Sequence, residues 1–220
     1  MFITFEGMDG SGKTTQIERV TAYLRGRGID LLVTREPGGT PVGEDIRAIL
    51  MDKANTGLVP RAEMLLFCAS RAQLVSEIIV PHLERDGVVL CDRYIDSSLA
   101  YQGYGHGLNI KELRSVLNFA TGGLLPDLTI YLDVTPDEGL RRRAAGSLFG
   151  EEFNRIDAMA SEFHRRVYKG YATIGRSAGG RWARIDAAQH PDAVFDDIVG
   201  VLNDALPALS RRSGKLKQKA

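Results

Sequence analysis

The sequence predicts an α/β protein with a doubly wound, five-stranded parallel sheet that carries helices on both faces. Five short apolar segments alternate with helical patterns along the 220 residues, and the turns after the first and second segments are rich in glycine. No shift in composition marks a domain boundary. We therefore expect a single domain over residues 1–206, followed by a basic, disordered tail over residues 207–220 that has few apolar side chains to bury.

A glycine-rich octet lies between the first strand and the first helix. Phe2–Glu6 is typical of a buried strand, and the next residues fit the pattern G-x-x-x-x-G-K-[ST]. Glycines let backbone N–H groups surround phosphate oxygens, and the following helix directs its positive end at the same anion. An ordinary glycine-rich turn is disfavoured because strand, loop and helix occur in the required order. The octet therefore predicts a P-loop NTPase-type fold that binds a nucleoside triphosphate, with contacts from Gly7, Met8, Asp9, Gly10, Ser11, Gly12, Lys13, Thr14 and Thr15.

The other strands are predicted from short runs of mainly apolar residues that end at polar or turn-forming residues. These runs are Ile29–Thr34, Val88–Cys91, Leu128–Asp133 and Arg181–Asp186.

The helices are predicted from apolar stripes and from residues that are typical of helix ends. Gly28 stands where a glycine ends a helix, and a bend is expected near Pro81. Thr135, Pro136 and Glu138 combine an N-cap hydroxyl, a proline in the first turn and the acid of a capping box. The expected spans are Gln16–Arg27, Val42–Met51, Pro60 to about Leu83, Asn109–Ala120, a helix from Pro136, Arg155–Ile174 and Pro191–Leu206.

Charged residues follow two of the predicted strands, at the sheet edge where α/β proteins bind ligands. Arg35 follows the second strand, where it could bind an anion or form a surface ion pair with Glu36. Asp92 and Arg93 follow the third strand. Asp92 could orient Mg²⁺, directly or through water, together with the Thr14 hydroxyl, and Arg93 could neutralise phosphate charge. The alternative for Asp92 and Arg93 is a buried structural ion pair.

A second group of candidate residues lies on the long helix after Pro60 and beyond the third strand. Phe67 and Arg71 are four residues apart, so they share a helix face and could stack on and hydrogen-bond to a flat base. A core phenylalanine beside a solvated arginine explains the spacing equally well. The hydroxyl- and amide-rich run Ser97–Gln102 suits sugar and base recognition, or a polar helix end, and Gly103 and the glycines after it are expected to loosen the chain.

An arginine cluster, Arg141–Arg143, follows the predicted helix start at Pro136. Because successive helical residues are about 100° apart, at most two of the three can face one phosphate. The glycines at Gly146 and Gly150 would let this helix swing as a small lid over residues 136–155, which excludes water from the reaction. The alternative is a solvated basic face.

Composition and missing motifs narrow the function. Lys plus Arg and Asp plus Glu both total 28, which gives no electrostatic argument for nucleic acid or an anionic membrane. Cys68 and Cys91 lie in apolar runs and fit buried free thiols, and no secretory or membrane-spanning pattern is evident, so we expect a cytoplasmic protein. No Asn-Lys-x-Asp motif of a GTPase switch and no second nucleotide-domain signature of a motor or transporter occurs. A small-molecule kinase remains, because its second substrate needs anion-binding arginines.

Several motifs in one order carry a resemblance to a known family. They are the octet, Thr34–Thr40, Phe67–Arg71, Asp92–Gly103 and Pro126–Asp133. From Met1 to about Leu206 the chain resembles the thymidylate kinases, and specifically the bacterial type with lid arginines. The resemblance implies transfer of the γ-phosphate of ATP to dTMP with Mg²⁺, giving dTDP and ADP in dTTP biosynthesis, by a homodimer. A kinase for another deoxynucleotide or nucleoside, and a nucleotide-dependent binding module, are the alternatives.

The resemblance also implies roles for individual residues. Thymidylate kinases of the eukaryotic type carry an arginine where this chain has Gly10, so the transfer charge is expected from the lid, with Arg142 and Arg143 as candidates beside Lys13, Asp92 and Arg93. The implied dTMP contacts are Asp9 to the sugar 3′-hydroxyl, Arg35 and Arg93 to the acceptor phosphate, Phe67 stacked on the base, Arg71 bonded to a base carbonyl, Tyr101 against the 2′-position, and Ser98 and Gln102 along base and sugar.

Overall fold

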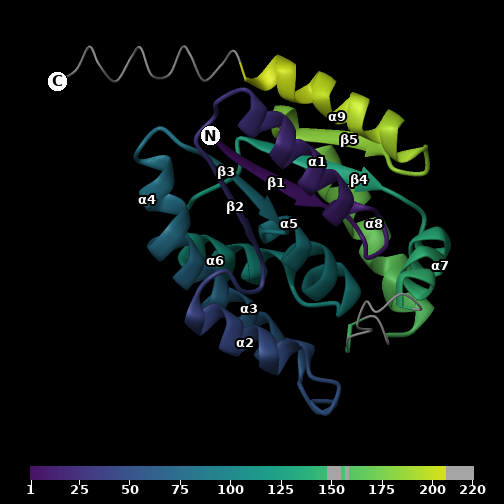
Figure 1. Ribbon diagram of the computed structural model, residues 1–220. Helices are drawn as coiled ribbons and strands as arrows, with labels where there is room; N and C mark the ends of the chain where they lie inside the picture. The colour runs from purple at the N-terminus through teal and green to yellow at the C-terminus, as the bar shows by residue number, and fades with distance from the viewer. Residues whose placement is uncertain (148–154, 157–158, 207–220) are drawn as a thin grey trace.

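The computed structural model describes residues 1–147, 155–156 and 159–206. Within these residues the chain forms the predicted parallel sheet of five strands in the order β2-β3-β1-β4-β5 (Figure 1). The strands are β1 (Phe2–Glu6), β2 (Leu31–Arg35), β3 (Val88–Asp92), β4 (Leu128–Asp133) and β5 (Trp182–Asp186). The predicted strands are confirmed with shifts of one or two residues at their ends, where the flanking turns determine which residues join the ladder.

The strand register brings the candidate residues to one edge of the sheet. Phe5, the penultimate residue of β1, is opposite Asp92 at the end of β3, and Arg35 at the end of β2 is also opposite Asp92. The glycine-rich octet continues directly from β1, the central strand. The carboxyl ends of β1, β2 and β3 therefore converge where the sequence predicts the ligands.

Helices cover both faces of the sheet, as predicted (Figure 1). One face packs Ile3 and Phe5 against the first and last helices, and the other packs Phe2 and Tyr131 against the remaining helical layer. This alternation follows from the opposite directions of successive strand side chains. The helices are α1 (Lys13–Gly26), α2 (Pro41–Met51), α3 (Pro60–Leu74), α4 (Val80–Leu83), α5 (Ile95–Ser98), α6 (Ile110–Thr121), α7 (Pro136–Ser147), α8 (Ser161–Ser177) and α9 (Pro191–Ala205), with π-helical turns η1 (Val75–Ile79) and η2 (Leu99–Gly105) and the 3₁₀ turn η3 (Gly179–Arg181).

The predicted bend near Pro81 is a π-helical turn. Helix α3 passes into η1 and then into α4, which contains Pro81. Proline lacks an N–H and its ring crowds the carbonyl of residue i−4, so a widened turn just before it relieves the clash. By length and composition alone, the 24-residue run Pro60–Leu83 could cross a bilayer, which the sequence argument overlooked. A core helix meets the same criteria, and this one buries the paired charges of Glu63 and Arg71.

Two local expectations were wrong. Gly103 and Gly105 do not loosen the chain but lie within η2, where a Cβ would be 2.5 Å from Ile110 or 2.7 Å from Phe163. These glycines let α6 and α8 pack closely on η2. The long helix expected from Arg155 begins only at Ser161, because Arg155 instead forms a long-range ion pair with Glu63 on α3.

Part of the predicted lid and the whole predicted tail cannot be compared with this fold. Residues 148–154 of the lid expected over 136–155, and the tail expected over 207–220, lie outside the described residues. Helix α7, which carries the arginine cluster, is described and begins at Pro136 as predicted. Its N-cap is the predicted Thr135, whose hydroxyl accepts a hydrogen bond from Glu138 N at 3.4 Å.

Candidate active site

The octet after β1 forms a tight phosphate-binding loop. Gly7, Gly10 and Gly12 have positive φ angles of 144°, 76° and 88°, and Gly12 is the residue before the first turn of α1. The Lys13 ammonium donates hydrogen bonds to the carbonyl oxygens of Gly7 and Met8 at 3.0 Å each. Burial, reinforced by nearby Arg93, lowers the pKa of Lys13 to about 8. Gly10, Gly12 and the Lys13 cation line one cavity at the N-terminus of α1, where helices attract anions.

A polar cavity of about 1140 Å³ of empty space opens in front of this loop. It unites the loop with Arg35 at the end of β2, Asp92 and Arg93 after β3, and Arg142 and Arg143 on α7. The predicted Lys13, Thr14 and Thr15 also line it. The cavity is rich in positive charge and has the composition expected of a site for polyphosphate.

The donors in this cavity fit Mg²⁺. One buried carboxylate oxygen of Asp92, Oδ1, has no hydrogen-bond partner within the described part of the chain, and Thr14 lines the same cavity as Asp92. Among the residues that the structure describes, no group of three or more His, Cys, Asp or Glu side chains could hold a metal alone. That is compatible with Mg²⁺, which commonly takes one or two protein oxygens and completes its shell with phosphate and water.

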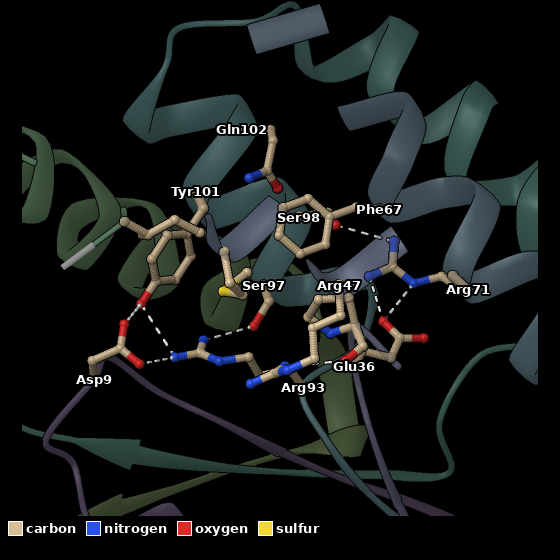
Figure 2. Close-up of a pocket in the computed structure, with 13 residues that line it drawn as sticks. Asp9, Glu36, Arg47, Phe67, Arg71, Arg93, Ser97, Ser98, Tyr101 and Gln102 are labelled. Carbon is tan, nitrogen blue, oxygen red and sulfur yellow. Dashed lines mark hydrogen bonds and ion pairs between the residues drawn. The ribbon is translucent and has the colours of Figure 1, made fainter. Parts of the chain in front are cut away.

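A second cavity, with about 590 Å³ of empty space, adjoins the first. Its lining includes every predicted dTMP contact except Arg35, namely Asp9, Phe67, Arg71, Arg93, Ser98, Tyr101 and Gln102. Figure 2 shows Asp9 and Tyr101 at one end, Arg71 and Glu36 at the other, and the Phe67 ring between them. Asp9, Glu36, Arg47 and Arg93 line both cavities, so the two spaces share a charged boundary.

Arg93 is the centre of a dense hydrogen-bonding network at that boundary. Its Nη2 donates to Asp9 Oδ1 at 2.8 Å, and its Nη1 donates to Ser97 Oγ at 3.1 Å. The Tyr101 hydroxyl donates to the other Asp9 oxygen at 3.1 Å, and the guanidinium lies 5.1 Å from the Tyr101 ring centre. Burial raises the pKa of Asp9, but Arg93 and Lys13 outweigh it and hold that pKa well below its usual range. Asp9 is therefore a carboxylate that orients Arg93.

Arg71 is buried rather than solvated, which excludes one of the two interpretations of its spacing from Phe67. Only 1% of it is exposed, and its Nε and Nη2 donate to Glu36 Oε2 at 2.8 and 2.5 Å. Nη1 donates to Ser98 Oγ at 3.0 Å and Nη2 to the Tyr94 carbonyl at 3.1 Å. The Phe67 ring is half-buried and faces the cavity (Figure 2). The pair thus presents a ring and a fixed cation to the same space.

The Gln102 amide has a fixed orientation. Its Nε2 donates to Glu63 Oε1 at 2.8 Å, which leaves the carbonyl oxygen on the side of the Phe67 ring (Figure 2). Glu63 also pairs with His106 at 3.2 Å and with Arg155. Although burial opposes it, hydrogen bonds from His106, Gln102 and Arg155 lower the pKa of Glu63 to about 2. Gln102 therefore offers a hydrogen-bond acceptor to a ligand.

The surface ion pair suggested for Arg35 and Glu36 is wrong. Arg35 pairs with Glu44 of α2 at 2.9 Å, and the buried Glu36 pairs with Arg71 instead. Successive strand residues point in opposite directions, so Arg35 and Glu36 at the end of β2 face different surroundings. Arg35 keeps a place in the lining of the first cavity.

The three arginines of α7 do not all face the same surroundings, as expected from the rotation of about 100° between successive helical residues. Arg142 and Arg143 line the first cavity, and Arg142 also donates to the Ala187 carbonyl at 2.9 Å. Arg141 is largely exposed and pairs with Glu138 at 2.7 Å.

Several site residues were missed by the sequence reasoning. Arg47 lines both cavities from α2, and Ser97 lines the second. Glu36 and Glu6 are buried supports of Arg71 and of the segment after Arg93, respectively. Arg47 lies outside the motifs described above, so no residue spacing in the sequence predicts a place for it in the site. For Glu6, the one indication in the sequence is that a glutamate, which is rarely buried, ends an apolar strand.

Comparisons with known proteins agree with this geometry. A family model described as thymidylate kinase matches residues 5–198. The chain is 47% identical over 219 residues to a thymidylate kinase of Roseiflexus sp. (strain RS-1), covering 96% of this chain and 97% of the relative. It is also 47% identical over 220 residues to that of Desulfovibrio desulfuricans, covering 98% and 99%. The crystal structure of thymidylate kinase from Ehrlichia chaffeensis superposes with a TM-score of 0.74 at 34% identity, covering 92% of this chain and 98% of that one. The chain belongs to the thymidylate kinase family.

Proposed function

We propose that the protein transfers the γ-phosphate of ATP to dTMP, giving dTDP and ADP as a step towards dTTP. The observation that carries the proposal is the shared boundary of the two cavities, which Arg93 and the loop residue Asp9 both line. Two bound nucleotides in these cavities would bring their terminal phosphates together at Arg93. Membership of the thymidylate kinase family supports the same reaction.

The charges of the first cavity suit phosphoryl transfer between two anions. The loop amides and Lys13 hold the donor phosphates, and Arg35 and Arg93 hold the acceptor phosphate in line with them. The acceptor is already ionised, so the reaction needs positioning and charge neutralisation rather than a strong general base. Arg142 and Arg143 supply further positive charge from α7. Mg²⁺ at Thr14 and Asp92, directly or through water, would offset negative charge on the phosphates.

The second cavity suits thymine or uracil better than cytosine. The Arg71 guanidinium donates to the base carbonyl that cytosine replaces with an amino group, and the Gln102 carbonyl oxygen accepts from the ring N–H that cytosine lacks. Phe67 stacks on the base. Asp9 faces the sugar 3′-hydroxyl, Tyr101 fills the space beside the 2′-position, and Ser98 lies against the base.

An acceptor series tests the proposed reaction. ADP release is measured in a coupled assay with ATP, Mg²⁺ and, in turn, dTMP, dUMP, dCMP and thymidine. We expect strong stimulation by dTMP and at least about 100-fold lower kcat/KM for dCMP, because unpaired buried polar groups are heavily penalised. Stimulation by thymidine rather than dTMP would identify a nucleoside kinase. ATP binding without stimulation by any acceptor would identify a binding module and refute the kinase assignment.

Replacing Phe67 with alanine is expected to raise the KM for dTMP about tenfold to a hundredfold, because aromatic stacking contributes roughly 1–3 kcal/mol per base. The KM for ATP should change little, since Phe67 lines the second cavity and not the first. Steady-state kinetics with each substrate varied in turn measures both values. Phe195→Ala, on the opposite face of the sheet, is the matched control. A selective loss of ATP affinity in Phe67→Ala would contradict base stacking.

We further propose that the reaction takes place in a single domain over residues 1–206, with a lid over about 136–155 that closes on the bound nucleotides, and with the basic segment 207–220 as a tail. The balanced charge and buried thiols support a cytoplasmic enzyme that has neither a nucleic acid nor a membrane as its partner.

A homodimer completes the proposal. Large apolar side chains are exposed on three neighbouring helices: Val42 and Ile49 on α2, Leu65 on α3 and Phe119 on α6. Helix α2 packs on α3, and α3 packs on α6, so these side chains lie on one layer of the protein (Figure 1). A second copy of the chain that covers this layer would remove them from water.

Replacing Leu65 with glutamate should therefore weaken the dimer about 100-fold, because an unpaired charge would be buried in the interface. Light scattering after size-exclusion chromatography, over a range of concentrations, measures the shift to monomer. Ala22→Glu, exposed on α1 across the sheet, should leave the mass unchanged. A wild-type protein that remains monomeric at high concentration would disprove the homodimer.

A further inference from the structure

Glu6 is a buried acidic residue that the proposed mechanism does not use. It ends β1, directly precedes the phosphate-binding loop and has no exposed surface. A carboxylate in such a position is costly unless several donors satisfy it. The groups that donate hydrogen bonds to Glu6 indicate its role in the site.

Among the described residues, the four hydrogen bonds to the Glu6 carboxylate come from the segment that carries Arg93 and from α8. Oε1 accepts from the backbone N–H groups of Tyr94 at 2.9 Å and Ser97 at 3.2 Å. Oε2 accepts from Ser97 Oγ at 2.6 Å and from the Tyr171 hydroxyl at 3.0 Å. The same two hydroxyl oxygens accept from Arg93 Nη1, at 3.1 and 3.5 Å. Glu6 and Arg93 therefore hold Ser97 and Tyr171 between them.

Arg93 has a backbone conformation that requires such support. Its φ angle is 68°, in the left-handed region that residues with a side chain rarely occupy. Unusual backbone conformations persist when the surrounding structure fixes them, and they are concentrated at functional sites. The Glu6 carboxylate binds the very next N–H, that of Tyr94, and the side chain of Ser97 one turn later.

We propose that Glu6 is a positioning residue: its carboxylate holds the Arg93 guanidinium at the boundary of the two cavities and ties it to the phosphate-binding loop that follows β1. Through Tyr171 it also links both to α8. The inference rests on the proposed function, because it assigns Glu6 to the arginine that receives the acceptor phosphate.

The surroundings of Glu6 give this role a measurable signature. Burial, reinforced by the nearby Asp96 carboxylate, raises the pKa of Glu6 to about 7, while hydrogen bonds and Arg93 oppose the rise. The other titratable groups whose charges interact with it are Lys13 on α1, Cys91 on β3, Tyr171 on α8 and Arg181 on η3. As pH rises through neutrality, Glu6 gains the charge that lets it accept all four bonds, so kcat/KM for dTMP should rise with it.

Glu6→Gln tests the role because it preserves shape and removes the charge. The glutamine can still accept from the two amides, but its Nε2 would donate to the hydroxyls of Ser97 and Tyr171, which also receive donors from Arg93. We expect kcat/KM for dTMP to fall about tenfold to a hundredfold and the KM for ATP to change by less than about threefold. The pH profile should lose the ionisation of Glu6 and keep that of the dTMP phosphate, whose second pKa is about 6. Wild-type turnover with dTMP is measured first, so that failure of the proposed function is recognised separately.

Ser97→Ala provides a second variant that keeps the carboxylate and removes the hydroxyl between Glu6 and Arg93. It should show the same selective loss for dTMP even if Glu6→Gln does not fold. Wild-type kinetics and an unchanged pH profile in Glu6→Gln would overturn the inference. An equal loss for ATP and dTMP together with a lower melting temperature would also overturn it, because that pattern indicates a merely structural residue.

Discussion

Alanine in place of Arg93 is expected to lower kcat with dTMP by about 10³-fold or more, while ATP affinity changes by less than about tenfold. Arg93 lines both cavities and is fixed by Asp9, Ser97 and Tyr101. Although burial opposes it, the pKa of Arg93 is raised well above its ordinary value by Tyr101 and Asp9, so the guanidinium stays charged. Its charge therefore lies at the shared boundary of the two cavities, where it would stabilise the negative charge of the phosphoryl group during transfer.

Steady-state kinetics for kcat and an equilibrium titration for ATP affinity separate these effects. Arg114→Ala removes an exposed arginine on α6 and serves as the matched control for charge. Unchanged kcat with dTMP in Arg93→Ala would eliminate the transfer role. A large loss of ATP affinity with little change in kcat would instead place Arg93 on the donor.

The sequence predicted those candidate site residues whose position depends on residues of the same strand or helix. Asp92 and Arg93 were predicted because they follow an apolar strand, and Phe67 and Arg71 because they share a helix face. All four residues line the cavities. The supports of these residues were not found. Arg71 is held by a glutamate 35 residues away, and Glu6 meets Tyr171 across 165 residues. Such pairs depend on how elements pack, which no local period encodes.

The dependence on packing between elements also explains why the prediction for Gly103 and Gly105 was wrong. In sequence, Gly103 and Gly105 have the appearance of a flexible connection. In the fold, their missing side chains make room for α6 and α8 against η2, so that Tyr101 and Gln102 are fixed at the cavity. Whether a glycine provides flexibility or close packing is decided by what lies opposite it.

Gly10, in the phosphate-binding loop, has no room for a side chain. A Cβ at Gly10 would overlap the carbonyl oxygen of Gly139, in the first turns of α7, and a Cβ at Gly139 would be 2.8 Å from the Asp9 carbonyl oxygen. The phosphate-binding loop and the helix that carries Arg142 and Arg143 are thus in direct backbone contact. Any side chain at position 10 must displace one of them.

Gly10→Ala is therefore expected to lower kcat/KM for ATP about 100-fold, because a shift of about 1 Å at the reacting groups has effects of that size. Gly28→Ala is the matched control: its φ angle of 72° is close to the 76° of Gly10, but a Cβ there meets no atom within 4 Å. Both variants should lose thermal stability from backbone strain, measured by calorimetry, and Gly10→Ala should lose more because its Cβ also overlaps the Gly139 carbonyl oxygen. Only Gly10→Ala should lose activity, and equal activities would show that the contact with α7 is unimportant.

Gly10→Arg tests whether an arginine in the phosphate-binding loop could replace the charge of the α7 arginines. If the contact between Gly10 and Gly139 sets the position of α7, an arginine at position 10 cannot act together with Arg142 and Arg143, and activity should fall at least as far as in Gly10→Ala. Adding Gly10→Arg to an Arg142→Ala, Arg143→Ala background should give no recovery, because the loop would still collide with the α7 backbone. Recovery of turnover in that triple variant would show that α7 can move aside, and that the charge of an arginine matters more than the element that carries it.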